Sequence, residues 1–329
     1  MVYFNGTMIP EKEAAVPIAD RGFRYGDGLF ETMRAYSGRV FRLERHVARL
    51  VESASVLGIE LGHIVASASR YTKRHRAPEI TEELLKKGKD GELCVLRVSV
   101  ARQIAEAVKT VVAANGIGEG TVRIILTRGT GGGFDVADEL RPNLIVTARP
   151  FNSVPEEQAR VGARAILSDI RRNTFSPVPR VKSLNFLENV LVRQEARRAG
   201  VDEGLMLDTE GHLVEASVSN LFFVKEGALH TPPTSCPILP GITREVVMAL
   251  ASERSVPCFE RAISPEEMPD MEEAFTTSTL REVMPLVEIN GQPVGTGKPG
   301  EVTRALMSAY RELVKEESDG VPGVVKVGF

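Results

Sequence analysis

The chain has 329 residues, of which 43% are hydrophobic and 26% are charged, and its formal net charge is −3. This length favours two domains, and the small net charge gives no field that would draw nucleic acid or anionic lipid to the protein. No apolar run approaches the ~20 residues that span a bilayer, and the first residues lack the basic-then-apolar order of a signal peptide, so we expect a cytoplasmic protein without membrane or nucleic-acid partners.

The first half of the sequence combines short strands with amphipathic helices. The predicted strands are residues 2–9, 29–36, 121–128 and 143–149. Apolar residues recur at helical spacing from Leu43 to Leu57, which predicts a helix that Gly58 ends. Residues 103–114 are also predicted to be helical. Residues 63–99 are an expected insertion, and residues 63–92 of it are polar and ambiguous. We interpret the basic cluster of Lys73, Arg74, His75 and Arg76 as a solvated surface insertion rather than a ligand site.

A polar stretch with two prolines, RPFNSVPEEQ, divides the chain. It predicts an N-terminal domain at 1–149, a linker at 150–157 and a C-terminal domain at 158–329. The predicted strands of the second half are 161–168, 203–208, 213–216, 219–225, 256–262, 272–277 and 283–289. Its predicted helices are 184–199, 243–253 and 299–316. Short strands mixed with isolated helices predict the α+β class rather than a doubly wound sheet.

The three cysteines give no sign of a metal site or a disulfide framework. Cys94, Cys236 and Cys258 are far apart and form no CxxC pair. We therefore interpret them as free thiols, most of them buried, and we predict no metal.

Lys182 differs from most lysines in its neighbours. It precedes the predicted helix 184–199, whose Leu187, Val190, Leu191 and Gln194 we expect to face the core. The positive end of a helix dipole disfavours a protonated lysine, and partial burial lowers its pKa as well. A lysine that is easily neutral is a better nucleophile toward an aldehyde, so this position suits an imine.

Three further segments carry candidate polar groups. Glu215 ends a short strand; read alone it is a solvated turn carboxylate, and the alternative is a partner for a pyridinium nitrogen. Residues 240–243 turn the chain into a helix, whose first N–H groups form an anion site together with Thr243. Residues 277–279 follow a strand and form a second candidate phosphate site. Arg49 has the geometry for a bidentate phosphate contact, although a lone arginine is more often a surface residue.

The order of these segments resembles the class-IV (fold-type IV) pyridoxal-phosphate enzymes. The similar blocks are DRGFRYGDGLFET with FRLERHVARL, KSLNFLENVLVRQEA, EASVSNLFFV, ILPGITR and TSTLREVMPL. They lie within about residues 2–62 and 100–316, whereas the 63–99 stretch is longer than this family has. The family contains branched-chain aminotransferases, D-amino-acid aminotransferases and 4-amino-4-deoxychorismate lyases. The resemblance implies a smaller α+β N-terminal domain and a larger C-terminal domain with the cofactor in the cleft between them. It also implies a homodimer in which a partner loop closes each site.

The resemblance also implies a role for each matching residue. Lys182 would hold pyridoxal 5′-phosphate as a Schiff base and move the proton between Cα and C4′, and Glu215 would pair with the pyridine nitrogen. The positions that match the phosphate cup are Arg49, Ile242, Thr243, Ser278 and Thr279. Leu239 would pack against one face of the ring, and Phe30 would line the substrate pocket.

The implied activity is transfer of an amino group between an amino acid and a 2-oxo acid. Glu31, which the transaminase branches commonly carry, favours this hypothesis. The alternative is a lyase that releases pyruvate and 4-aminobenzoate from aminodeoxychorismate, favoured by the glycine-rich loop and the KSLNFLENVL block. A non-catalytic binding protein is the third hypothesis, and the presence of Lys182 and Glu215 argues against it.

The substrate follows less directly from the sequence. Phe186, assigned to the substrate pocket, stands where branched-chain aminotransferases usually have a tyrosine. The 128–135 loop, RGTGGGFD, lacks the arginine and histidine of the D-amino-acid enzymes at their expected places. SVSN after Glu215 resembles the D-amino-acid and lyase branches more than the branched-chain branch. The sequence therefore leaves the amino donor, the acceptor and the stereochemistry open.

Overall fold

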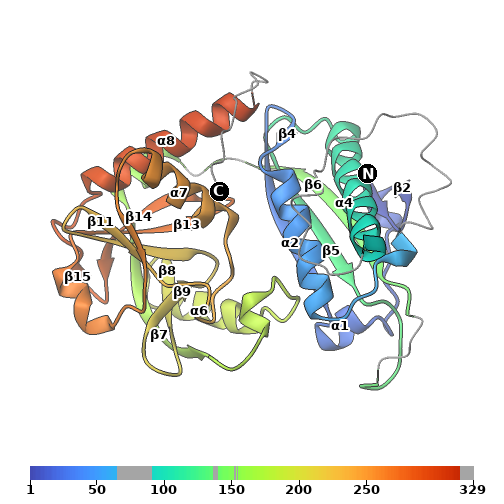
Figure 1. Cartoon of the computed structure of the whole chain (residues 1–329), viewed down its shortest axis with the longest axis horizontal. Coiled ribbons are helices and arrows are strands. Elements are labelled where there is room, and N and C mark those ends of the chain that lie inside the picture. The colour runs from blue at the N-terminus through green and yellow to red at the C-terminus, as the bar shows by residue number, and fades with distance from the viewer. Residues whose placement is uncertain (65–90, 136–139, 152, 154, 319–329) are drawn as a thin grey trace. The chain divides into compact units, whose positions relative to one another are not determined.

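The computed structural model describes residues 1–64, 91–135, 140–151, 153 and 155–318 (Figure 1). These residues form two compact units. Unit 1 comprises Met1–Asn152 with Lys182–Asn185, and unit 2 comprises Ser153–Val181 with Phe186–Glu317. Compactness alone does not define a domain, so the boundaries at 149 and 158 stay a prediction.

Unit 1 is built on an antiparallel sheet with the strand order β2-β1-β6-β5-β3-β4. Its strands are β1 (Val2–Phe4), β2 (Thr7–Ile9), β3 (Gly28–Tyr36), β4 (Arg39–Val40), β5 (Gly120–Thr127) and β6 (Asn143–Pro150). Helices α2 (Leu43–Val56) and α4 (Gly91–Ala114) pack together over one face of this sheet (Figure 1). Alternate residues of β3, including Glu31 and Met33, are buried under them.

The two helices of unit 1 follow their apolar stripes. The predicted stripe of α2 is confirmed, since Leu43, Val47 and Leu50 are buried, and Gly58 follows the helix with a left-handed backbone. Helix α4 starts at Gly91 rather than at residue 103. Val98, in the part of this helix that overlaps 63–99, is buried, so the end of the predicted insertion belongs to a packed helix. Residues 65–90 of that stretch lie outside the described residues.

Unit 2 is built on a nine-stranded sheet, six strands of which close into a barrel. The ring runs β10-β13-β14-β7-β8-β9 and closes because β9 pairs with both β8 and β10. These strands are β7 (Ala163–Arg172), β8 (Glu203–Asp208), β9 (Leu213–Ala216), β10 (Asn220–Lys225), β13 (Glu273–Ser278) and β14 (Glu282–Ile289). The remaining strands are β11 (Ala228–Thr231), β12 (Cys258–Glu260) and β15 (Gln292–Pro293). Every strand of the ring contributes to one apolar core, as in other barrels whose interior is filled by side chains.

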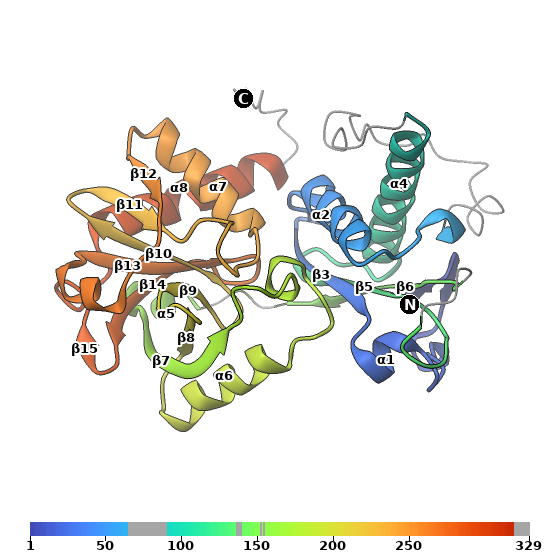
Figure 2. The ribbon, with the colours of Figure 1, turned by 60° about the horizontal axis from the view of Figure 1, so that its bottom comes forward.

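Helices cover the outside of unit 2 (Figure 2). They are α5 (Glu156–Val161), α6 (Leu187–Arg198), α7 (Ile242–Glu253) and α8 (Glu301–Ser318). Helix α6 packs on β7 and β8, while α7 packs on β12 and β13. The α+β class predicted from the sequence is confirmed.

The predicted buried face of α6 is wrong. Leu187, Val190 and Leu191 are 68%, 45% and 42% exposed, and Gln194 is exposed as well. The helix instead buries Asn189, Val192 and Ala196. The backbone of β8 at Gly204 sets this choice, because a Cβ there would lie 2.5 Å from Cγ1 of Val192. The aliphatic residues are thereby left on the outer side.

The structure also bears on the predictions for the cysteines and for membrane-spanning helices. Cys236 and Cys258 are free thiols, as predicted, but both are half-buried rather than buried, and the side chain of Cys94 lies outside the described part of the chain. Burial raises the pKa of the Cys236 and Cys258 thiols. Among the residues that the structure describes, no helix has the length and apolar character needed to cross a membrane.

Candidate active site

Lys182 lies in a short segment that pairs with the start of β3. The N–H of Phe30 donates to the carbonyl of Lys182 at 2.9 Å, and the N–H of Leu184 donates to the carbonyl of Gly28 at 2.9 Å. The Lys182 Nζ lies 4.7 Å from the centre of the Phe30 ring. Helix α6 begins only at Leu187, so the first turn of that helix does not include Lys182, and the argument from the helix dipole is weaker than the sequence indicated.

Two glycines make room for this segment. A Cβ at Gly28 would lie 2.5 Å from the carbonyl oxygen of Leu126 and 2.8 Å from the side chain of Leu184. Gly26 has a φ of 67° and lies against Asn185, whose side-chain amide donates to the Gly26 carbonyl. The GDG sequence therefore holds the chain on either side of Lys182 close to β3.

Glu31, His46 and Arg49 form a buried polar cluster on the helical face of the same sheet. The Arg49 Nε and Nη2 donate to the two carboxylate oxygens of Glu31 at 2.8 and 2.7 Å, and the His46 Nδ1 lies 2.8 Å from Glu31 Oε2. Glu31 is fully buried. Burial by itself raises the pKa of Glu31, but the charge of Arg49 and the bonds from both partners outweigh it and hold this pKa at about 2.

The cluster keeps His46 neutral. Burial lowers the pKa of His46, the hydrogen bond to Glu31 offsets this only in part, and the charges of Arg49 and Lys182 lower the pKa further. His46 had no role in the sequence analysis, and Glu31 served only as a marker of a family branch. The spacing of His46 and Arg49, three residues apart on one helix, was the signal available.

Arg123 is a further residue that the sequence analysis missed. It lies on β5, opposite Thr32 of β3, and its guanidinium carbon is 4.5 Å from the centre of the Phe30 ring. The Phe30 ring is therefore in contact with two cationic groups, those of Arg123 and Lys182.

Arg128 is turned away from this face. Its Nε donates to Asp27, and its two terminal nitrogens donate to the carbonyls of Leu57 and Gly58 just after α2. All three nitrogens are thus engaged within unit 1, so Arg128 does not act here as the loop arginine of a carboxylate clamp.

In unit 2, Glu215 and Leu239 are in hydrogen-bond contact. The Arg172 Nη2 donates to Glu215 Oε1 at 2.9 Å, and the N–H of Leu239 donates to Oε2 at 3.1 Å. The Asn220 amide donates in turn to the Leu239 carbonyl at 2.8 Å. Glu215 is only 5% exposed, so its reading as a solvated turn carboxylate is wrong. The sequence analysis missed Arg172, which lies on a different strand.

The start of α7 is arranged to receive an anion. Gly241 precedes the helix, and no described side chain caps it. A Cβ at Gly241 would lie 1.9 Å from Oδ1 of Asn220, so the position has room only for glycine. Asn220 is paired across the sheet with Thr277, and Thr243 is buried on the first turn.

Two hydroxyl groups support the same interpretation. Thr277 Oγ1 and Ser219 Oγ are buried and have no hydrogen-bond partner among the described residues. Buried hydroxyls are nearly always bonded, and an oxygen-rich ligand would satisfy them. Ser278, the next residue after Thr277, accepts the N–H of Arg281 at 3.3 Å. The residues present therefore fit a phosphate group.

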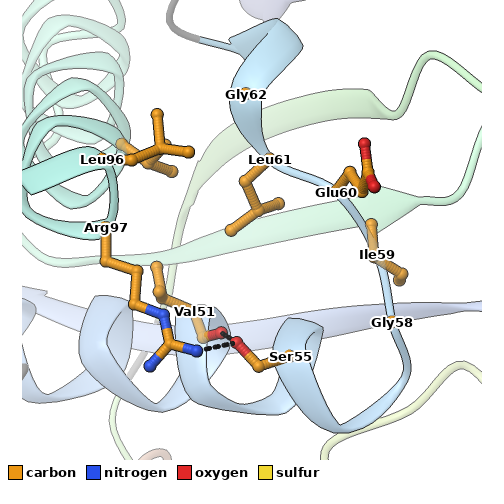
Figure 3. Close-up of a pocket in the computed structure, with 10 residues that line it drawn as sticks. Val51, Ser55, Gly58, Ile59, Glu60, Leu61, Gly62, Leu96 and Arg97 are labelled. Carbon is orange, nitrogen blue, oxygen red and sulfur yellow. Dashed lines mark hydrogen bonds between the residues drawn. The ribbon is translucent and has the colours of Figure 1, made fainter. Parts of the chain in front are cut away.

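A separate cavity of about 460 Å³ lies among the helices of unit 1 (Figure 3). Val51 and Ser55 of α2, the loop from Gly58 to Gly62, and the start of α4 line it. Arg97 donates to the Ser55 hydroxyl at 3.0 Å across this cavity. Its lining includes none of the residues assigned to the cofactor or the substrate, so it is not the predicted site.

The comparisons with known proteins identify the family. Residues 28–289 match the family model described as amino-transferase class IV, and the chain belongs to this family. A Methanocaldococcus jannaschii protein provisionally named branched-chain-amino-acid aminotransferase is 35% identical over 314 residues, which cover 95% of this chain and 96% of that protein. A D-alanine aminotransferase of Bacillus licheniformis is 30% identical over 96% of this chain and 98% of its own length.

Solved structures have the same fold. A branched-chain amino acid aminotransferase of T.th. with pyridoxamine 5′-phosphate has a TM-score of 0.80 and 28% identity over 97% of this chain and 96% of its own. A 4-amino-4-deoxychorismate lyase of Pseudomonas aeruginosa has a TM-score of 0.74 and 28% identity over 97% of this chain and 100% of its own. The chain is an enzyme, an aminotransferase that acts on an amino acid and a 2-oxo acid.

Proposed function

We propose that the chain binds pyridoxal 5′-phosphate at Lys182 and transfers amino groups with it. The observation that carries the proposal is the placement of Lys182, whose main chain is fixed to β3 and whose Nζ lies against Phe30. When bound, the cofactor supplies an electron sink for the electron pair that remains when the substrate Cα loses its proton.

Lys182 moves that proton. With the cofactor bound, its Nζ would accept the proton from the substrate Cα and return it on the cofactor side, which requires an amine that is neutral at the start. The Phe30 N–H bond to the Lys182 carbonyl keeps the main chain still while the side chain moves.

Glu215 would hold the ring nitrogen of the bound cofactor in its protonated form. The Arg172 guanidinium and the Leu239 N–H stabilise the ionised carboxylate. An ionised carboxylate beside the ring nitrogen strengthens the electron sink. Leu239, whose main chain is held by Glu215 and Asn220, would pack against the ring.

The phosphate group is assigned to the uncapped start of α7 and the end of β13. Backbone N–H groups at a helix start bind anions, and the hydroxyls of this region add donors. The residues assigned to the phosphate are Arg49, Ile242, Thr243, Ser278 and Thr279, together with the hydroxyl of Thr277, which has no hydrogen-bond partner in the described part of the chain.

Arg123 favours a dicarboxylic amino acid as one of the two substrates. Its guanidinium lies on the same ring of Phe30 as the Lys182 amine. A guanidinium binds a carboxylate through two parallel hydrogen bonds, so a side-chain carboxylate of the substrate is its natural partner. Phe30 and Phe186 remain the predicted apolar surface of the substrate pocket.

The lyase reaction is the second candidate. The likeness to the Pseudomonas aeruginosa lyase and the glycine-rich loop at 129–133 support it. The first steps at Lys182 serve both reactions. Release of 4-aminobenzoate from aminodeoxychorismate at a rate above that of amino transfer would favour the lyase.

The homodimer and the cytoplasmic location stay predictions. The exposed aliphatic stripe of Leu187, Val190 and Leu191 on α6 supports association with another chain. Light scattering of the purified protein tests this directly, since a mass near 35.9 kDa would mean a monomer.

The test of the proposed function is cofactor uptake. Purified protein is incubated with pyridoxal 5′-phosphate, treated with borohydride and digested, and the modified peptide is identified by mass. The proposal predicts modification at Lys182. Modification at other lysines without any at Lys182 would refute the assignment.

A further inference from the structure

We propose that Glu31 is a positioning residue that fixes the guanidinium of Arg49 and so makes the site selective for the phosphorylated cofactor. This inference rests on the proposed function. In this proposal Glu31 does not contact the reacting atoms. Its substitution weakens binding of the cofactor phosphate but not binding of the aldehyde and the ring.

The geometry of the pair is specific. Both carboxylate oxygens of Glu31 accept hydrogen bonds from Arg49, one from Nε and one from Nη2. Two parallel bonds fix the plane of a guanidinium as well as its position, which a single bond does not. Glu31 is fully buried, so water does not compete for either oxygen.

His46 completes the environment of the carboxylate. Because Glu31 is ionised, the bond at 2.8 Å requires the hydrogen of His46 to be on Nδ1. Burial, with a smaller contribution from the charges of Arg49 and Lys182, lowers the pKa of His46 and favours a neutral imidazole, so the cluster contains one anion and one paired cation. His46 thus prevents Glu31 from shifting toward another donor without adding a charge of its own.

The same strand also fixes Lys182. Glu31 directly follows Phe30 on β3, and the Phe30 N–H holds the Lys182 carbonyl. Consecutive residues of one strand therefore position the amine that attaches the cofactor and the cation assigned to its phosphate. A substitution of Glu31 that leaves the backbone of β3 in place therefore disturbs the position of Arg49 and not that of Lys182.

A purely structural role for Glu31 makes a different prediction. A buried ion pair that only stabilises the fold would, when broken, weaken binding of every cofactor equally. A positioning role weakens binding only of ligands that carry a phosphate. Pyridoxal, which has the aldehyde and the ring but no phosphate, separates the two roles.

The experiment compares pyridoxal 5′-phosphate and pyridoxal on four proteins: wild type, Glu31→Gln, His46→Asn and the control Glu119→Gln. Glu119 is an exposed carboxylate that lies 4.0 Å from Arg34 in the same unit. The apparent dissociation constant is obtained from the fraction of Lys182 trapped by borohydride at increasing ligand. Inorganic phosphate is added to a second series with pyridoxal.

For Glu31→Gln we expect the constant for pyridoxal 5′-phosphate to rise about 10-fold or more, on the scale of one charged hydrogen bond. The constant for pyridoxal should stay within about 3-fold. Asn at position 46 keeps a donor near Nδ1, so His46→Asn should change both constants by less than Glu31→Gln does. The control should match wild type. Equal losses for the two ligands, or no loss for either, would overturn the inference.

Two further results keep the tests separate. If wild type takes up no cofactor at Lys182, the proposed function fails rather than the role of Glu31. If Glu31→Gln does not fold, Glu31→Asp carries the same prediction, because its shorter carboxylate cannot keep both bonds to Arg49. In an Arg49→Lys background the Glu31 substitution should have little further effect on phosphate selectivity.

Discussion

Lys182 has separate main-chain and side-chain roles, and one substitution distinguishes them. Its carbonyl accepts the Phe30 N–H whatever the side chain is. Lys182→Ala should therefore lose covalent cofactor and all turnover while the fold is kept, since the contact of Nζ with the Phe30 ring contributes only about 0.5–1 kcal/mol. Intact mass after borohydride treatment and thermal unfolding check both parts. Turnover at the wild-type rate would refute the role of Lys182.

Glu31 should make stability depend on pH in acid. Its pKa in the folded protein is about 2, below the ordinary value of 4.5. A lowered pKa stabilises the fold above the ordinary value, and this contribution is lost as the pH falls from 4.5 toward 2. The difference corresponds to about 3 kcal/mol. Urea unfolding across this range should show a steeper loss in wild type than in Glu31→Gln, which keeps the other carboxylates of lowered pKa such as Asp27 and Glu267. Parallel curves would contradict this prediction.

At the scale of single residues, the sequence was informative where the residues of a motif are close together in the chain. Lys182 and Glu215 were chosen from their immediate neighbours, and the structure brings Glu215 to the predicted Leu239. Arg172 and Arg123 were missed because their partners, Glu215 and Phe30, lie far away in the sequence. Only the pairing of strands brings such residues together, and no local pattern in the sequence indicates it.

At the scale of elements, the start of α7 depends on one glycine. Gly241→Ala would place a Cβ 1.9 Å from Oδ1 of Asn220, a residue whose Nδ2 donates to the Leu239 carbonyl. We expect a loss of about 1–3 kcal/mol in the free energy of unfolding and weaker binding of the phosphorylated cofactor. Gly118→Ala is a matched control, because nothing lies within 4 Å of its added Cβ. If the two variants had the same free energy of unfolding and the same affinity for the cofactor, a side chain at position 241 would be tolerated and the prediction would be wrong.

The end of α2 depends on Arg128, which joins two carbonyls after that helix to Asp27. Arg128→Ala should lower the free energy of unfolding by about 3 kcal/mol, since Asp27 then keeps only the Arg21 pair. The KM for the amino acid should change little, because Arg128 is not a substrate ligand. If the folded variant had a KM raised more than about 10-fold, Arg128 would be a substrate ligand and this prediction would be wrong.

The apolar residues of a helix predicted its buried face correctly for α2 and wrongly for α6. The stripe of α2 has one buried side, so its spacing predicted both the helix and its face. Helix α6 carries aliphatic residues on its exposed side and buries Asn189 instead, which bonds to the carbonyl of Ser217. Hydrophobicity alone therefore selected the wrong face of α6. The early start of α4 was missed because its first residues are not clearly periodic.

At the scale of the whole molecule, the order of the sequence blocks predicted the family, and the match over residues 28–289 confirms it. The assignment of Lys182–Asn185 to unit 1 was not predictable, because it results from pairing with β3 rather than from any local pattern. The choice among substrates also depends on residues such as Arg123 that several strands bring together.

The most direct test of the account is a single-turnover measurement with one amino acid at a time and no added 2-oxo acid. Protein loaded with pyridoxal 5′-phosphate is mixed with a panel that includes dicarboxylic, branched-chain and D-amino acids, and with aminodeoxychorismate in a separate sample. The account predicts about one 2-oxo acid released per Lys182 for at least one amino acid, best for a dicarboxylic one, and none from Lys182→Ala. A protein that releases no 2-oxo acid from any member of the panel, or that forms 4-aminobenzoate instead, would contradict it.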